Sequence, residues 1–172
     1  MFMSPHNLTA LLSNALPFPA AHKFNRSLTG AQFAARASML NGCAIKLHRL
    51  AIERSSRAEV RDYARQMAEA HIWTAEALLT SVQSTHLHVE LYQQPDDRHH
   101  RRLEALNLVA LPDFDYDYID AQNRLYMELI VLSEQYIETG ADKALAFFAT
   151  NTLSYLSHHL QQFAPLAGAD CQ

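Results

Sequence analysis

Three histidines of this chain occupy positions where helical periodicity places core residues. His71 and His159 each fall at the centre of the apolar face of a helical segment, and His48 lies on the shoulder of a third such face. Tyr126, with Gln122 one turn before it, points inward on a fourth segment. Neutral imidazoles suit Zn, Cu, Fe and Ni, and three of them leave an open position on the metal. The set predicts either a site for one transition-metal ion or a buried core in which these polar groups hydrogen-bond to one another.

Carboxylates are missing from the places where oxygen-activating helical bundles carry them. Di-iron sites use a Glu from each of two helices and a Glu three residues before the His of each of the other two. Ala68 and Leu156 occupy those preceding positions, and Glu69 lies on nearly the opposite face from His71. No Ser or Cys stands beside a base at a spacing typical of nucleophilic catalysis. The sequence therefore favours a non-catalytic protein without a cofactor, and a mononuclear metal site at the three histidines is the alternative.

Trp73 projects from the polar side of the helix that carries His71. A large aromatic side chain there is either covered by another segment of the chain or marks a surface that binds a protein partner. The N-terminal segment would serve as the cover, because its apolar side chains also need burial: Leu8, Leu11, Leu12, Leu16 and Phe18. Both interpretations stay open, and a second copy of the chain is one of the partners to consider.

An acidic run, DFDYDYID, places carboxylates at alternate positions over residues 113–120, as calcium loops of the EF-hand type do. Tyr118 stands where that motif needs a glycine, and Arg124 stands where it needs a bidentate Glu. We therefore interpret the acids as groups that stabilise the N-terminus of a helix through its dipole.

Composition narrows the range of partners. The chain has 172 residues and a net charge of -4, so it has no basic field that attracts nucleic acid or anionic lipid. No apolar stretch approaches the roughly 18 residues that a membrane span requires. Two cysteines, Cys43 and Cys171, do not make the dense disulfide framework of a small secreted domain. We expect one domain with its own hydrophobic core and no nucleic-acid partner.

The first 28 residues resemble a degraded secretory signal. An apolar centre at residues 8–16 precedes small residues at Ala20 and Ala21, but no Lys or Arg comes before Lys23, and prolines crowd the cleavage position. Residues 1–21 are either a cleaved leader of a periplasmic or envelope protein, or part of an irregular arm on a cytoplasmic one.

Scarce glycine is typical of an all-α protein. Only four glycines occur, and none lies between residues 43 and 139. Helical periodicity is strong in four long segments, the first of which runs from about residue 31 to residue 54. The second begins at a capping box formed by Ser56 and Glu59. After a polar connection, Asp96 or Asp97 caps a short helix.

The third long helix starts near Asp113, and Gly140 is expected to end it in a left-handed conformation. The last runs from about residue 142 to residue 163 and stops before Pro165. Four amphipathic helices bury their apolar faces most economically as an antiparallel four-helix bundle, with the short helix in the connection between the second and the third. We expect this domain to cover residues 29–166, with a short C-terminal tail at residues 167–172.

Three stretches, taken in order, are similar to one known family. They read AQFAARASMLNGCAIKLHRLAIERSSRAEVRDYARQMAEAH, FDYDYIDAQ and LAFFATNTLSYLSHHL. Their order and spacing resemble the bacterial ferritin-like family catalogued as domain of unknown function 4142, over about residues 30–166. The resemblance implies an antiparallel four-helix bundle, often in exported or envelope proteins, without an established activity.

The resemblance also marks positions in the chain. The family usually carries an acidic pair followed by His in its second helix, which corresponds here to residues 69–71, and His159 matches its His in the last helix. Ala44 stands where the family has a Glu, and Tyr126 stands where it has a His. Half of the inner polar set is replaced, which favours a structural core in which Tyr126 hydrogen-bonds an imidazole.

Overall fold

The computed structural model describes residues 27–167, and the side chains of residues 27–160. Every element in this range is an α-helix, which confirms the all-α prediction. The helices are α2 (Gly30–Arg54), α3 (Ala58–Gln83), α4 (Asp97–Leu108), α5 (Leu111–Thr139) and α6 (Lys143–Ala167). Within this described part, no helix has the length and apolar character to cross a membrane.

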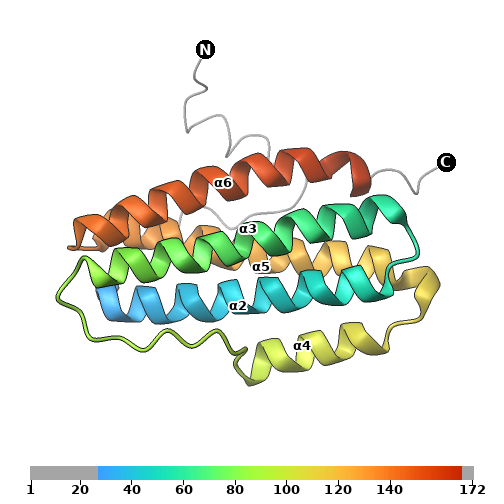
Figure 1. Cartoon of the computed structure of the whole chain (residues 1–172), viewed down its shortest axis with the longest axis horizontal. Helices are drawn as coiled ribbons and strands as arrows, with labels where there is room; N and C mark the ends of the chain where they lie inside the picture. Colours follow the sequence, from blue (N-terminus) through green and yellow to red (C-terminus); the bar gives the residue numbers. More distant parts are fainter. Residues whose placement is uncertain (1–26, 168–172) are drawn as a thin grey trace, which may run out of the picture.

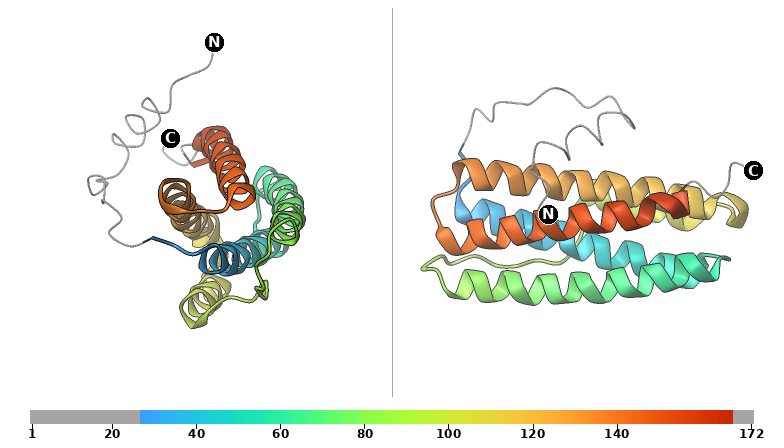
Figure 2. Two further views of the ribbon diagram at one scale, coloured as in Figure 1. Left: turned by 90° about the vertical axis from the view of Figure 1, so that its left-hand side faces the viewer. Right: turned by 90° about the horizontal axis from the view of Figure 1, so that it is seen from above.

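The four long helices α2, α3, α5 and α6 lie side by side around a common core (Figure 1 and Figure 2). α2 packs against α3 and α5, and α6 packs against the same two helices. Each of these neighbouring pairs runs antiparallel (Figure 1). The connection after α3 returns along the outside of α2 to α4, which contacts α2 and α5 from outside the four. The four long helices therefore enclose the core, and α4 adds a partial outer layer on α2 and α5.

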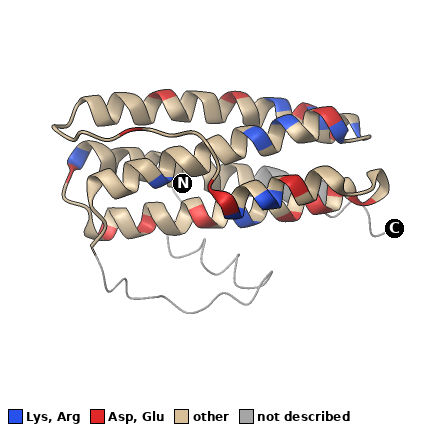
Figure 3. Ribbon diagram, turned by 90° about the horizontal axis from the view of Figure 1, so that it is seen from below, with Lys and Arg blue, Asp and Glu red and all other residues tan. Residues whose placement is uncertain are grey.

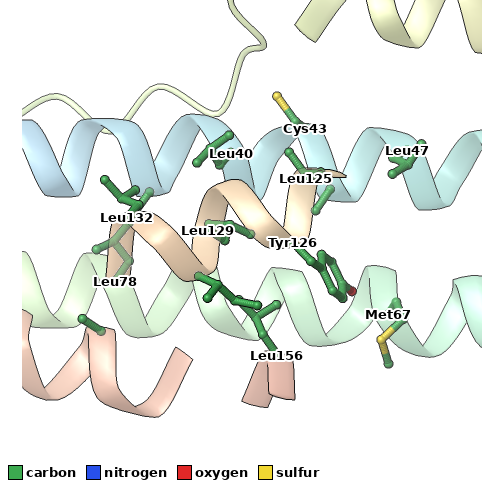
Figure 4. Packing of buried hydrophobic residues seen from close by; sticks show 14 of the residues in the cluster. Leu40, Cys43, Leu47, Met67, Leu78, Leu125, Tyr126, Leu129, Leu132 and Leu156 are labelled. Atoms are coloured by element: carbon green, nitrogen blue, oxygen red, sulfur yellow. The ribbon is translucent and has the colours of Figure 1, made fainter. Parts of the chain in front are cut away.

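Leucines and aromatic residues fill the space between the long helices. Leu40, Leu129 and Leu156, from α2, α5 and α6, are all buried and belong to one core cluster (Figure 4). Toward one end, the ring of Phe33 stacks on that of Tyr136 with centroids 4.2 Å apart. Each such side chain contributes about 1.5 to 3 kcal/mol through removal from water. This apolar packing sets the positions of the few polar groups that the core contains.

The capping box predicted at Ser56 and Glu59 is wrong. The N-cap of α3 is Arg57, which makes no side-chain capping hydrogen bond. The hydroxyl of Ser55 accepts from the Arg57 amide at 3.2 Å, and this serine turn sets the start of the helix instead. A capping box does occur at the start of α2, where Thr29 is the N-cap.

Gly140 ends α5 in an extended conformation, with φ −76° and ψ 139°, so the predicted left-handed cap is wrong. A β-carbon at this position would lie 2.6 Å from the carbonyl oxygen of Tyr136, and glycine is needed for that close approach. The chain then turns into α6, where the Asp142 carboxylate accepts from the amides of Ala144 and Leu145.

α6 continues through Pro165 to Ala167, beyond the end predicted for it. Pro165 lies in the last turn of the helix. A proline there removes the one hydrogen bond that its own N–H would make, and the helix ends two residues later.

Two contacts fix the outer layer to α2. A β-carbon on Gly42 would lie 2.1 Å from the carbonyl oxygen of Gln93, so the returning connection crosses α2 at backbone contact distance. At the end of α2, the guanidinium of Arg54 donates to the carbonyl oxygens of Leu106 at 3.2 Å and Val109 at 2.7 Å. Arg54 thereby satisfies carbonyl groups at the C-terminal end of α4.

Candidate functional site

His71 of α3 is buried between the long helices, with 1% of its surface exposed. The side-chain amide nitrogen of Asn41 donates to the backbone carbonyl oxygen of His71 at 2.7 Å, which leaves the amide oxygen facing His71 Nδ1 at 2.8 Å. An amide oxygen only accepts, so Nδ1 carries the proton and Nε2 carries the lone pair. Asn41 of α2 therefore fixes the tautomer of His71.

Tyr126 of α5 connects the two buried histidines. Its hydroxyl lies 3.1 Å from His71 Nε2 and 3.4 Å from His48 Nε2. Because His71 Nε2 only accepts in this tautomer, the hydroxyl donates to His71 and accepts from the Nε2–H of His48. Nδ1 of His48 is then an acceptor, and the Tyr118 hydroxyl donates to it at 2.9 Å. We name this directional series the histidine–tyrosine chain; its members are Tyr118, His48, Tyr126, His71 and Asn41.

Further aromatic and polar groups surround the histidine–tyrosine chain. The rings of His48 and His71 are nearly parallel, with centroids 5.4 Å apart and planes inclined by 21°. Tyr63 meets the ring of His48 edge-on, and the amide nitrogen of Gln122 donates to the Tyr63 hydroxyl at 2.9 Å. Gln122 is fully buried, as its helical position predicts. The helices α2, α3 and α5 thus contribute polar groups to one buried hydrogen-bonded cluster.

Burial keeps the histidine–tyrosine chain uncharged. Removal from water, with a smaller contribution from neighbouring His71 and His159, holds the pKa of His48 well below its usual value. The same burial, assisted by His159, lowers the pKa of His71 to about 3. Loss of hydration raises the pKa of Tyr118 and Tyr126 well above the usual value. At neutral pH, hydrogen bonds between neutral groups therefore hold this region together.

His159 of α6 lies beside the histidine–tyrosine chain, and its side chain is half-buried. Its ring centroid is 4.2 Å from that of Tyr155, and the Tyr155 ring packs edge-on against His71 at 6.1 Å. Across residues 27–160, no three His, Cys, Asp or Glu side chains gather closely enough to hold a metal ion. Metal binding by His48, His71 and His159 stays a prediction.

Trp73 lies on the outer side of α3, with 71% of its surface exposed. Ile72 and Leu79 of the same helix are also exposed, at 41% and 47%. The predicted cover for Trp73 comes from the N-terminal segment, and residues 1–26 lie outside the described part of the chain, as does the cleavage predicted near residue 21.

Asn41, Tyr118 and Tyr63 were not expected among the polar members of the core. One signal in the sequence does point to Asn41, because it lies seven residues before His48, two turns away on the same helix face. Tyr118 and Tyr63 have no such signal, since a tyrosine on an apolar helix face is equally consistent with simple packing. Only the depth of each ring in the core decides whether its hydroxyl meets an imidazole.

Comparison with known proteins identifies the family. The family model described as domain of unknown function (DUF4142) matches residues 14–166. The chain belongs to this family. No curated protein and no solved structure matches this chain.

This DUF4142 protein departs at two positions, Ala44 and Tyr126, from the pattern that the resemblance leads us to expect. Both positions face the buried cluster. Ala44 is fully buried in α2 and brings no carboxylate to His48, which lies one turn further along. Tyr126 occupies the other position, and its hydroxyl contacts both histidines. In this DUF4142 chain, a hydroxyl thus stands between two imidazoles where the resemblance leads us to expect a third imidazole.

Proposed function

We propose that this DUF4142 protein is a non-catalytic, ferritin-like four-helix bundle whose buried histidines and tyrosines stabilise the fold and whose surface binds another protein. One observation carries the proposal: all four ring nitrogens of His48 and His71 have hydrogen-bond partners within the protein. A metal ligand needs a free lone pair on a ring nitrogen, and here both lone pairs accept from tyrosine hydroxyls. The antiparallel packing of the long helices around one core supports the ferritin-like arrangement.

Elemental analysis of protein purified without an affinity tag tests this structural role. We expect far less than one metal ion per chain and a melting temperature that a chelator does not change, because no metal contributes to the folded state. A content near one ion per chain, lost together with thermal stability on chelation, would contradict the proposal.

A mononuclear transition-metal site is the second candidate, and a specific contact favours it. The Nε2 atoms of His48 and His71 converge on one point, which the Tyr126 hydroxyl occupies. Tyr126→His would supply an imidazole there, and Co²⁺ titration followed by its visible absorption would report binding. On this second hypothesis the wild-type protein binds Co²⁺ through His48, His71 and His159, and Tyr126→His binds it more tightly than the control Tyr116→His, whose position is exposed. Wild-type protein that binds no Co²⁺ would exclude it.

The interaction role rests on Trp73, a large aromatic residue that is mostly exposed. Trp73→Ala should weaken recovery of the partner in a pull-down while changing the free energy of unfolding by less than about 0.5 kcal/mol. Leu108→Ala, which removes another exposed apolar side chain on α4, is the matched control. A loss of stability in Trp73→Ala would instead mean that another segment covers the ring.

We further propose a periplasmic or envelope location, in keeping with the family resemblance and the signal-like first residues. Cell fractionation with N-terminal sequencing of the mature protein tests this location. An intact N-terminus on protein recovered from the cytoplasm would contradict it.

A further inference from the structure

A pocket of about 300 Å³ lies between α4 and the two long helices that α4 covers, α2 and α5. Its inner walls are apolar, with Leu47 from α2, Leu103 and Leu106 from α4, and Ala121 and Leu125 from α5. This volume is at the lower end of the range typical of small-molecule sites. Because α4 lies outside the four long helices, the pocket is on the outer side of their core.

Cys43 belongs to the apolar wall of this pocket. Its sulfur points away from Leu129 and the other core leucines (Figure 4), and the residue lines the pocket. Burial is the main cause that raises the pKa of the Cys43 thiol to about 12. The thiol is therefore uncharged and acts as a small apolar group.

The charged groups around the pocket mostly neutralise one another. Arg124 Nε lies 2.8 Å from the carboxylate of Asp120, and Arg102 lies 2.8 Å from the carboxylate of Glu128. Charged residues concentrate at the end of the molecule that holds α4 (Figure 3). Each of these two arginines thus already has a carboxylate partner, and Glu128 also pairs with Arg98.

Asp117 is the exception among these groups. It lines the pocket and is half-buried. No ion pair and no hydrogen bond formed by side chains of residues 27–160 includes its carboxylate, whereas Asp120 and Glu128 on the same helix are both paired. A carboxylate partly removed from water beside apolar walls gains from a cationic partner. The pocket therefore combines an apolar interior with a single available negative charge.

We propose that this pocket binds a small amphipathic amine. The ammonium group of the ligand pairs with Asp117, and its apolar part lies among Leu47, Leu103 and Leu125. A carboxylate ligand of the same shape would meet the charge of Asp117 without a free arginine to offset it. A neutral alcohol would gain the apolar contacts but no charge-assisted hydrogen bond.

Titration of the ¹⁵N-labelled full chain with hexylamine, 1-hexanol and hexanoate, followed by amide NMR, tests the proposal. We expect hexylamine to shift the amide resonances of Leu103, Leu106 and Leu125 in a saturable way. We expect it to bind at least about tenfold more tightly than 1-hexanol, since hydrogen bonds to charged groups are the stronger class. Hexanoate should bind more weakly than either.

Asp117→Asn should weaken hexylamine binding about tenfold and leave 1-hexanol binding unchanged. Asp113→Asn is the matched control, because it removes the same charge from the exposed first turn of α5, outside the pocket. Hexylamine binding that is equal in Asp117→Asn and the wild-type protein would overturn the proposal. So would shifts confined to residues away from the pocket, tighter binding of hexanoate, or no saturable binding of hexylamine.

Discussion

The inner and outer sides of α2 hold polar groups under opposite conditions. On the inner side, His48 belongs to a series of hydrogen bonds between uncharged groups that are removed from water. On the outer side, charged groups attach α4 to α5. His99 of α4 is buried between two carboxylates, with Asp96 at 2.6 Å from Nδ1 and Glu128 at 3.2 Å from Nε2. The same helix thus separates a neutral polar core from a charged outer layer.

The pKa shifts favour neutral histidines in the inner region and charged carboxylates in the outer layer. Burial holds the pKa values of His48 and His71 low, so these bases stay neutral. In the outer layer, the hydrogen bond from the His99 amide lowers the pKa of Asp96. Burial opposes ionisation of Glu128, but the hydrogen bond from Arg102 and nearby positive charges lower its pKa overall. Deep burial selects neutral, hydrogen-bonded groups, whereas a half-exposed layer keeps its charges because water still solvates them.

The largest effect is expected from Tyr126→Phe. Loss of the hydroxyl leaves Nε2 of His48 and Nε2 of His71 buried without partners, at a combined cost of about 3 kcal/mol. Urea unfolding followed by circular dichroism measures this loss. Tyr116→Phe, at an exposed position, should leave the unfolding midpoint unchanged. Equal midpoints for the two variants would mean that the histidine–tyrosine chain contributes nothing to stability.

A smaller effect is expected from His71 alone when the wild-type protein is acidified. His71 has a pKa of about 3 in the folded state, against a usual value of 6.5. Its neutral form is favoured by folding, so its contribution is complete above pH 6.5 and is lost as the pH falls toward 3. The free energy of unfolding should therefore drop by about 2 kcal/mol between pH 7 and pH 5 from His71 alone. His48 acts with the same sign.

The pH profile of the urea midpoint checks this prediction. His71→Gln should make the profile less steep, because one of the two buried imidazoles is gone while a polar side chain of similar reach stays near Tyr126 and His48 still titrates. His86→Gln, at an exposed position, should keep the wild-type slope. A wild-type profile that is flat from pH 7 to pH 5 would show that these imidazoles are not held neutral.

The smallest effect is expected in the outer layer. Glu128→Gln removes a carboxylate that Arg102 and His99 contact, and we expect a loss of about 1 kcal/mol, because partly exposed ion pairs contribute little. Added salt should reduce this loss by screening, whereas the loss in Tyr126→Phe should not respond to salt. Urea midpoints at low and high ionic strength measure both. If the loss of stability in Glu128→Gln did not change with salt, the outer layer would not differ from the inner core in its response to screening.

Much of the fold follows from local patterns in the sequence. Helical periodicity gives the four long helices to within a few residues, and Asp96 caps α4 as an N-cap residue is expected to. Helix ends were harder to predict, because competing local contacts decide them. At the start of α3, a hydrogen bond to Ser55 is found instead of the capping box predicted at Ser56 and Glu59. At the end of α5, Gly140 fits closely against Tyr136 instead of adopting the predicted left-handed conformation.

The candidate site was predictable only in part. Periodicity turns His48 and His71 toward the core, and both are buried there. The hydrogen-bond partners depend on the rotation and height of each helix relative to its neighbours, which no single helix encodes. Likewise, the Asp117 carboxylate lies in a pocket without a partner among the described side chains because of where α4 lies across α2 and α5.

By itself, the sequence determined that the chain is all-α, which faces of its helices are apolar, and which histidines turn inward, because these properties repeat along each helix. The tertiary structure alone decided that His48 and His71 meet one hydroxyl, that Asn41 sets a tautomer, and that α4 encloses a pocket on the outer side of α2. Contacts between helices arise from packing of whole surfaces, and the hydrogen-bond chain exists only when several helices bring its members together.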